Sequence, residues 1–95
     1  MTTWTWSPAK NRANQRKHRL SFEKAQRAFD DPLLLSRLDT GSIEERWQSI
    51  GLIEGVAVIV VHTWFEDEGQ EASGRIISAR KATKHEKKAY EDGRF

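Results

Sequence analysis

Residues 56–65, which read VAVIVVHTWF, are the most strand-like stretch of this 95-residue sequence. β-Branched and aromatic residues fit the pleated surface of a sheet, and here they occupy both sets of alternating positions. A strand that is apolar on both faces is normally covered on both sides, so this stretch predicts a central strand. Its purely apolar part, Val56–Val61, has six residues. A membrane-spanning helix needs about 20, and the sequence predicts none.

The segments on either side of this stretch predict further strands. Glu54-Gly55 suits a hairpin turn, because glycine accepts a positive φ, and this turn joins residues 56–65 to a strand at Arg46–Ile53. Glu66–Ser73 is predicted to be an acidic loop. Shorter strands are expected at Thr3–Trp6, Leu33–Leu38 and Gly74–Arg80.

The first predicted helix is almost entirely polar. Ser7-Pro8 is typical of a helix start, with serine as the N-cap and proline in the first turn. The helix over residues 8–17 has only Ala9 and Ala13 as apolar positions. Most of its surface is therefore expected to face water and to present Lys10, Asn14, Lys17 and His18.

Two more helices complete the predicted order. Ser21 caps the second helix, whose buried stripe is Phe22, Ala25 and Phe29, and Asp31-Pro32 ends it. The third helix covers Lys81–Glu91. The order of elements predicts one α+β domain over residues 1–95: a small antiparallel β-sheet with two N-terminal helices and one C-terminal helix.

Charge is distributed unevenly along the chain, although the net charge is only +2. Residues 1–20 hold five basic residues and no acidic one, and residues 75–95 hold seven basic and three acidic. Residues 21–74 hold four basic and 11 acidic residues. If the fold brings the two ends together, they form a positive face suited to a phosphate backbone. The alternative is that both ends are simply solvated.

Several classes of chemistry have no residues to support them. The chain has no cysteine, which excludes disulfides, thiolate zinc sites and cysteine nucleophiles and agrees with a reducing cytoplasm. The three histidines, His18, His62 and His85, lack the spacing of a zinc site, so no metal and no cofactor is expected. Phosphate-binding glycine loops and serine-hydrolase motifs are absent from the sequence. The first residues also lack the basic and apolar regions of a secretory signal.

What remains is a set of basic and polar groups at predicted strand and helix ends: Lys17, His18, Glu45, Arg46, Arg75, Arg80 and Tyr90. Such groups can cleave a phosphodiester without a metal. Arginine and lysine stabilise charge on phosphoryl oxygens, a carboxylate or histidine moves the proton, and RNA supplies its own 2′-OH nucleophile.

Each of these residues also has a purely structural interpretation. His18 can cap its helix, His62 can be a satisfied core residue, and Tyr90 can fill the space between the last helix and the sheet. The tryptophans are expected in the core or on a sheet face, although Trp47 or Trp64 can stack on a base if exposed. Leu33–Leu35 is expected to be core, with a partner contact as the alternative.

The sequence resembles the BrnT family of toxins over about residues 4–90. The resemblance starts with Trp6, Lys10, Asn14, Lys17-His18 and Ser21-Phe22, and continues through Phe29-x-Asp31-Pro32 and Glu45-Arg46-Trp47. It ends with Arg75-Ile76-Ile77-Ser78-Ala79-Arg80-Lys81-Ala82-Thr83-x-x-Glu86-x-x-x-Tyr90. Each piece is weak alone, whereas all of them in order at this spacing form a specific pattern.

The resemblance implies a RelE-like fold and a metal-independent endoribonuclease that cuts RNA and so inhibits translation. It implies a cognate BrnA-type antitoxin, encoded beside the toxin, and contact with operator DNA only through that antitoxin. It also implies a bacterial, cytoplasmic protein with no membrane partner. The catalytic positions carried over are Lys17, His18, Glu45, Arg46, Arg75, Arg80 and Tyr90, and the expected RNA-binding positions are Lys10, Asn14, Lys81 and Lys84.

Two rival functions stay open at this point. One is a non-catalytic nucleic-acid-binding module that uses the same basic face, and the other is a decayed toxin that acts only in a repressor complex. Glu45 separates enzyme from binder, because a carboxylate beside Arg46 repels phosphate and is useful only for moving a proton. Lys81 stands where many relatives have arginine, which keeps the charge but loses the bidentate geometry toward phosphate.

Overall fold

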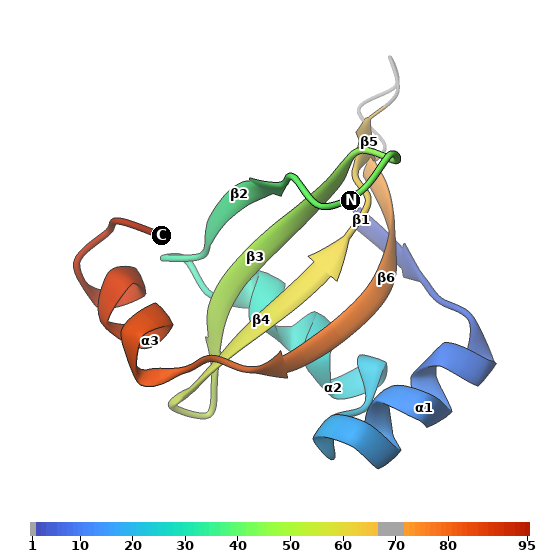
Figure 1. The fold of residues 1–95 in the computed structure, drawn as a ribbon, viewed down its shortest axis with the longest axis horizontal. Coiled ribbons are helices and arrows are strands. Elements are labelled where there is room, and N and C mark those ends of the chain that lie inside the picture. Colours follow the sequence, from blue (N-terminus) through green and yellow to red (C-terminus); the bar gives the residue numbers. More distant parts are fainter. Residues whose placement is uncertain (1, 67–71) are drawn as a thin grey trace.

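The computed structural model describes residues 2–66 and 72–95 (Figure 1). Its elements in chain order are β1 (Thr2–Thr5), α1 (Pro8–His18), α2 (Phe22–Ala25), the 3-10 helix η1 (Gln26–Asp30), β2 (Leu35–Asp39), β3 (Arg46–Ile53), β4 (Val56–His62), β5 (Phe65–Glu66), β6 (Ala72–Lys81) and α3 (Lys84–Glu91). Of the acidic loop predicted at Glu66–Ser73, residues 67–71 lie outside the described residues, and the flanking residues belong to β5 and β6.

The strands form one sheet in the order β1-β6-β4-β3-β2, with β5 also pairing with β6. The pairs are antiparallel except that of β1 with β6, which is parallel. The predicted α+β class is confirmed, as are two N-terminal helices and one C-terminal helix. The parallel edge pair was not predicted, because β1 pairs with a strand about 70 residues later and no local pattern reveals that partner.

The β3–β4 hairpin is the centre of the sheet. β3 has the predicted bounds, and Glu54 and Gly55 take φ values of 51° and 81°. Two positive φ values are typical of a type I′ turn, which matches the twist of the strands. β4 ends at His62 rather than at Phe65, because the pairing register with β6 shifts between Val61 and His62.

The second predicted helix is split into α2 and the tighter η1. The close contact of η1 with β3 depends on Gly51, where a Cβ would collide with the backbone carbonyl of Ala28. The side chain of Ser21 caps α2 by accepting from the N–H of Lys24. η1 ends at Asp30, and its C-cap is Asp31, before Pro32, where the sequence predicted the helix to end.

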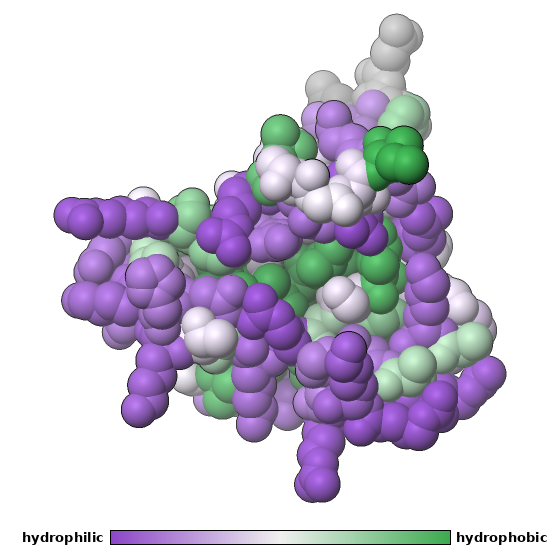
Figure 2. Space-filling model, viewed as in Figure 1, coloured by the Kyte–Doolittle hydropathy of each residue, from purple (hydrophilic) through white to green (hydrophobic). Residues whose placement is uncertain are grey.

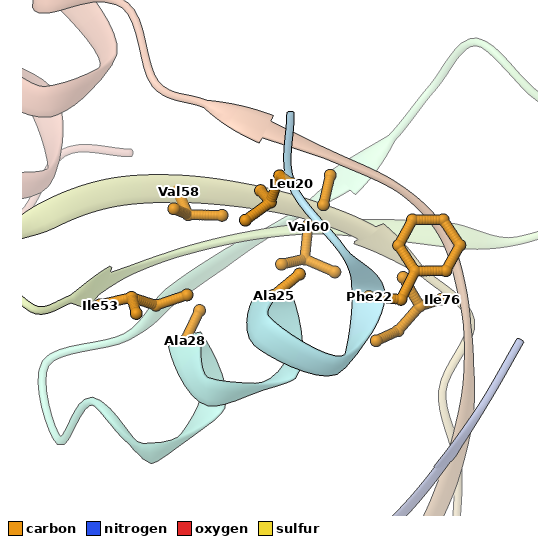
Figure 3. Packing of buried hydrophobic residues seen from close by; sticks show 9 residues of the cluster. Leu20, Phe22, Ala25, Ala28, Ile53, Val58, Val60 and Ile76 are labelled. Atoms are coloured by element: carbon orange, nitrogen blue, oxygen red, sulfur yellow. The ribbon is translucent and has the colours of Figure 1, made fainter. Parts of the chain in front are cut away.

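The larger core lies between these two helices and the sheet (Figure 3). β4 contributes Val58 and Val60 to it, and α2 contributes Phe22, which is completely buried. Burial of one such phenylalanine stabilises the fold by about 2–3 kcal/mol. This face of the sheet is called the helix side below.

A smaller core lies on the opposite face of the sheet, under α3. Its buried residues are Ile50, Ala57, Ile59 and Tyr90. Alternation along β4 explains the division, since residues 57 and 59 point to one face and residues 58 and 60 to the other. The third helix begins at Lys84 instead of at Lys81, because β6 continues through Lys81 and Thr83 then caps α3.

α1 is attached to the sheet through polar side chains. The amide of Asn14 accepts from the N–H of Ala79 at 3.1 Å and donates to its carbonyl at 2.9 Å and to that of Leu20 at 2.9 Å. Asn14 therefore pairs with the edge of β6 beyond the end of β1, much as a strand would. The prediction that Asn14 faces water is wrong, because this amide is 6% exposed.

Candidate active site

The candidate residues on the strands share the face of the sheet that carries α3, called the polar face below. Ile50 packs under α3, so alternation along β3 places Arg46 and Gln48 on the same face. Ile76 belongs to the core on the helix side, so Arg75 points the other way. Figure 2 shows apolar surface in the middle of this face, over β4 and β6, surrounded by hydrophilic residues.

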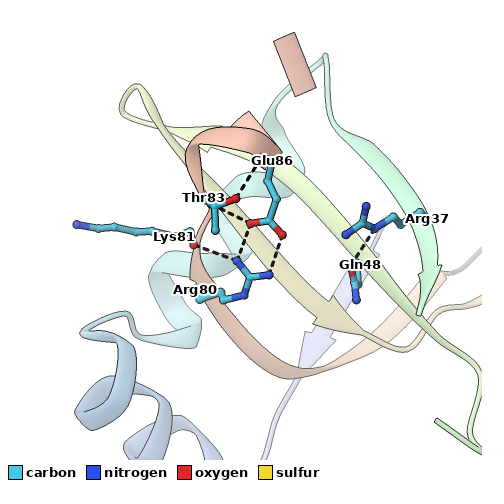
Figure 4. A network of polar contacts seen from close by, with 6 residues as sticks. All are labelled: Arg37, Gln48, Arg80, Lys81, Thr83 and Glu86. Atoms are coloured by element: carbon cyan, nitrogen blue, oxygen red, sulfur yellow. Dashed lines mark hydrogen bonds and ion pairs between the residues drawn. The ribbon is translucent and has the colours of Figure 1, made fainter. Parts of the chain in front are cut away.

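Arg80 is the most firmly oriented candidate (Figure 4). Its Nη1 and Nη2 donate to the two carboxylate oxygens of Glu86 at 2.7 and 2.9 Å, and Nη1 also donates to the carbonyl of Lys81 at 3.3 Å. A guanidinium has five N–H donors. Within the described residues, these contacts use three of the five and leave donors on Nε and Nη2, the edge that can hold a phosphate in a bidentate manner.

Glu86 joins this arginine to the start of α3. Its Oε1 accepts from the backbone N–H of Thr83 at 2.8 Å, and the Thr83 hydroxyl accepts in return from the N–H of Glu86 at 3.2 Å. This reciprocal pair is a capping box. The hydrogen bonds that Arg80 and Thr83 donate to Glu86 outweigh burial and lower the pKa of Glu86 to about 2. The same hydrogen bonds from Arg80 to Glu86 raise the pKa of Arg80. The pair is therefore ionised at neutral pH.

Arg46 lies in a chain of polar contacts across β3 and β2. Its Nη2 is 3.0 Å from Oδ2 of Asp39, whose Oδ1 accepts from Nε2 of Gln48 at 3.3 Å. The Oε1 of Gln48 accepts from Nε of Arg37 at 3.0 Å. The Nε of Arg46 is buried and has no hydrogen-bond partner among residues 2–66 and 72–95. Within this described part of the chain the Nε–H is therefore unpaired but out of reach of a ligand.

Arg75 and Glu45 lie at the same end of the sheet as Arg46. The Nη2 of Arg75 is 2.7 Å from Oε1 of Glu44, in the loop before β3, and both side chains are about half exposed. Glu45 follows Glu44 and is exposed. Arg80 lies further along, because it is level with Ile59 and Ile50, four residues beyond Arg46 on β3. At ~3.3 Å per residue the offset is roughly 13 Å along the strand.

Lys17 and His18 end α1, with Lys17 exposed and His18 half-buried. Asn14 binds the backbone of Ala79, the residue before Arg80, and His18 is one helical turn beyond Asn14. Residues four apart on a helix are ~6 Å apart. The fold thus brings the basic end of α1 to the C-terminal part of β6, whereas α3 lies across the opposite face of the sheet.

Tyr90 is buried, and its hydroxyl donates to Oδ2 of Asp31 at 2.5 Å. Burial and this carboxylate raise the pKa of Tyr90 to about 12. Asp31 also accepts hydrogen bonds from the backbone N–H groups of Leu33 and Leu52. Burial alone would raise the pKa of Asp31, but the hydrogen bonds from Tyr90, Leu52 and Leu33 together outweigh it, so the pKa is lowered. The hydroxyl is therefore directed at the turn before β2 and not at Arg80.

The predicted RNA-binding residues divide into two groups. Lys10, Lys81 and Lys84 are exposed, at the start of α1, the end of β6 and the start of α3. Asn14 is buried, and both of its amide N–H donors bind backbone carbonyls. Its side chain supports the position of α1 and has no donor left for RNA.

The helix side of the sheet carries an aromatic groove that the sequence did not reveal. It has a volume of about 870 Å³, and its aromatic lining is Trp4, Phe29, Trp47, His62 and Trp64. His62 is buried, as its interpretation as a core residue predicted. Burial lowers the pKa of His62, and the hydrogen bond to the carbonyl of Thr63, which raises the pKa, has the smaller effect. Its Nε2 is 2.7 Å from the hydroxyl of Ser49.

The residues that sequence reasoning missed are the carboxylates that hold the arginines: Asp39, Glu44 and Glu86. Only Glu86 had a local signal, because Thr83-x-x-Glu86 is the pattern of a capping box.

Among the described residues, no group of three or more histidines and carboxylates is arranged to hold a metal ion. None of the helices described is long and apolar enough to cross a membrane.

Comparison with protein families gives one match. The model described as "Ribonuclease toxin, BrnT, of type II toxin-antitoxin system" matches residues 6–86. This range covers α1 through the first turn of α3 and includes every candidate site residue except Tyr90. No curated protein matches the chain.

Proposed function

The chain belongs to the BrnT family of ribonuclease toxins of type II toxin–antitoxin systems, and on this basis we propose that it cleaves RNA on the polar face of its sheet. The observation that carries this proposal is the Arg80–Glu86 pair. The guanidinium is fixed by two charge-assisted hydrogen bonds, and its Nε–Nη2 edge keeps two donors. A phosphate bound at that edge can accept hydrogen bonds from Nε and Nη2 of Arg80 without any movement of the guanidinium. Donors that are already in position stabilise the charge that develops in a transition state.

The reaction we propose is an internal transesterification of RNA, with no metal ion. The 2′-oxygen forms a bond to the adjacent phosphorus while the bond from phosphorus to the 5′-oxygen breaks. A base takes the proton of the 2′-OH, and an acid supplies a proton to the leaving 5′-oxygen. The products are a 2′,3′-cyclic phosphate and a 5′-hydroxyl, and Arg80 stabilises the extra negative charge on the phosphoryl oxygens.

The candidates for proton transfer differ in their surroundings. Glu45 and His18 are the candidate bases, and His18 lies nearer to Arg80 because α1 contacts the backbone of Ala79. Lys17 and Tyr90 are the candidate acids. We favour Lys17, since it is exposed at the end of α1, whereas the Tyr90 hydroxyl would first have to leave Asp31.

The remaining basic groups define a path for the RNA chain. Arg46 and Arg75 lie roughly 13 Å along the sheet from Arg80, which is too far to share its phosphate. They would bind neighbouring phosphates, and Lys10, Lys81 and Lys84 would add non-specific attraction. We propose that cleavage along this path takes place in the cytoplasm and inhibits translation, and that a cognate antitoxin neutralises the toxin and carries any contact with operator DNA.

Incubation of purified protein with a defined single-stranded RNA in excess chelator tests this proposal. We expect chelator-resistant internal cleavage, with fragments that end in 2′,3′-cyclic phosphate. Wild-type chain expressed without its antitoxin should stop growth and fragment cellular RNA, whereas folded Arg80→Ala should do neither. Folded wild-type protein that binds RNA and leaves it intact would refute the enzymatic proposal in favour of a binding module.

A further inference from the structure

The aromatic groove on the helix side is lined by rings that pack against one another. Trp4 stacks on Phe29 with ring centroids 4.0 Å apart and meets the edge of His62 at 5.1 Å. Trp64 leans against Trp4 at 5.7 Å. Aromatic contacts of this kind limit ring movement. The groove therefore loses little conformational entropy when another molecule fills it.

This groove is accessible from solvent, and apolar side chains extend beyond it. Trp64 lines the groove and is 40% exposed. Leu34 lines the groove, and its neighbour Leu33 is 69% exposed. Exposed apolar residues that adjoin an aromatic groove are typical of a protein interaction site.

The charges around the groove distinguish between two classes of partner. Asp30 lines the groove and is exposed, and Glu66 is exposed in β5 beside Phe65. The lining cation, Arg27, is paired with Glu54 at 3.1 Å, so its charge is largely compensated. An acidic rim repels RNA phosphates and attracts a segment that carries basic residues beside apolar anchors.

We propose that the aromatic groove binds the cognate antitoxin, through a segment with apolar anchor residues flanked by lysine or arginine. This inference rests on the toxin–antitoxin part of the proposed function. A volume of about 870 Å³ holds several large side chains, and a few such anchors supply most of the binding energy of an interface. The antitoxin would then contact the face of the sheet opposite to the Arg80–Glu86 pair.

Affinity measurements with the purified cognate antitoxin test this proposal. Trp64→Ser should weaken binding about 30-fold or more, as expected for removal of a central aromatic anchor. Asp30→Lys should weaken it about tenfold, with a smaller dependence on salt, because it reverses a charge on the rim. Val56→Ser is the matched control, since Val56 is similarly exposed, at 43%, but lies outside the groove, and it should change the affinity less than twofold.

RNA cleavage by the free toxin provides the second readout. All three variants should cleave at the wild-type rate and melt near the wild-type temperature. Unchanged antitoxin affinity in folded Trp64→Ser and Asp30→Lys would overturn the proposal. Loss of RNA affinity with intact antitoxin binding would also overturn it and assign the groove to RNA bases. If the wild-type protein does not cleave RNA, but Trp64→Ser and Asp30→Lys still weaken antitoxin binding, the ribonuclease proposal fails and the groove assignment stands.

Discussion

The two faces of this sheet use the same strands for different purposes. On the helix side, β4 buries Val58 and Val60 beneath α2 and η1, in the larger core of the protein. On the polar face only one end is covered, where α3 packs on Ile59. Three arginines on that face, Arg46, Arg75 and Arg80, are each held by a carboxylate. The comparison indicates that the helix side supplies stability, which leaves the polar face available for chemistry.

The largest effect should follow from a change on the helix side. Phe22→Ala removes a completely buried ring from α2 and should lower the free energy of unfolding by about 3–5 kcal/mol. Urea denaturation measures this loss. The matched change on the polar face, Leu35→Ala, should cost clearly less, because Leu35 is only partly buried at the edge of the smaller core. Equal losses would show that stability is not divided in this way.

The converse test is Arg80→Ala on the polar face. It should lower the rate of RNA cleavage by about 10²–10³, the usual cost of removing one donor to the transition state. The free energy of unfolding should change by less than about 1 kcal/mol, because Arg80 is partly exposed. Arg80→Lys restores the charge without the paired donors and should recover only part of the rate. Full activity in Arg80→Ala would remove this residue from the site.

Acid should affect the two faces through different groups. The pKa of Glu86 is lowered to about 2 in the folded protein, from 4.5 for the free side chain. Its contribution to stability is thus present above about pH 4.5 and lost as the pH falls toward 2. His62 also has a lowered pKa, so protonation destabilises the fold as the pH falls below 6.5.

Urea denaturation at a series of pH values from 7 to 3 separates these contributions. Glu86→Gln should flatten the part of the profile below pH 4.5 and leave the part between pH 6.5 and 5 unchanged. It should also slow cleavage, because a neutral amide orients Arg80 less firmly. A profile that is identical to wild type in Glu86→Gln would show that the Arg80–Glu86 pair adds nothing to the folded state.

The smallest effect is expected at the β3–β4 turn, which lies away from the arginines of the polar face. Glu54 has a φ of 51°, a region that asparagine tolerates better than glutamate. Glu54→Asn should raise the free energy of unfolding by about 0.5 kcal/mol, after loss of the exposed ion pair with Arg27. Thermal melts measure the gain, and the rate of RNA cleavage should not change. A decrease in stability would show that the ion pair outweighs backbone strain.

Local features of the fold were predictable from sequence. The bounds of Arg46–Ile53, the turn at Glu54-Gly55 and the caps Ser7 and Ser21 all depend on residues within a few positions of one another. The parallel pairing of β1 was not predictable, because its partner is distant in sequence. The buried amide of Asn14 was missed for a related reason. On a polar helix, periodicity gives no indication of which polar side chain faces the sheet.

The candidate site was predictable as a list of residues but not as an arrangement. Alternation places Arg46, Arg75 and Arg80 on one face, as the proposed phosphate contacts require. Their separation and their carboxylate partners depend on strand register and on the position of α3, which no short pattern encodes. The aromatic groove was missed because its tryptophans come from three segments, each of which resembles ordinary core.

RNA should bind the polar face of the sheet and not the aromatic groove. Titration of ¹⁵N-labelled protein with an RNA that carries a 2′-O-methyl group at every position, and so has no 2′-OH nucleophile, tests this prediction by NMR. We expect the Nε–H signals of Arg46, Arg75 and Arg80 to shift, while the indole N–H signals of Trp47 and Trp64 stay unchanged. Shifts of the two indole signals with unperturbed arginines would contradict the division of the molecule into a stable side and a chemical face.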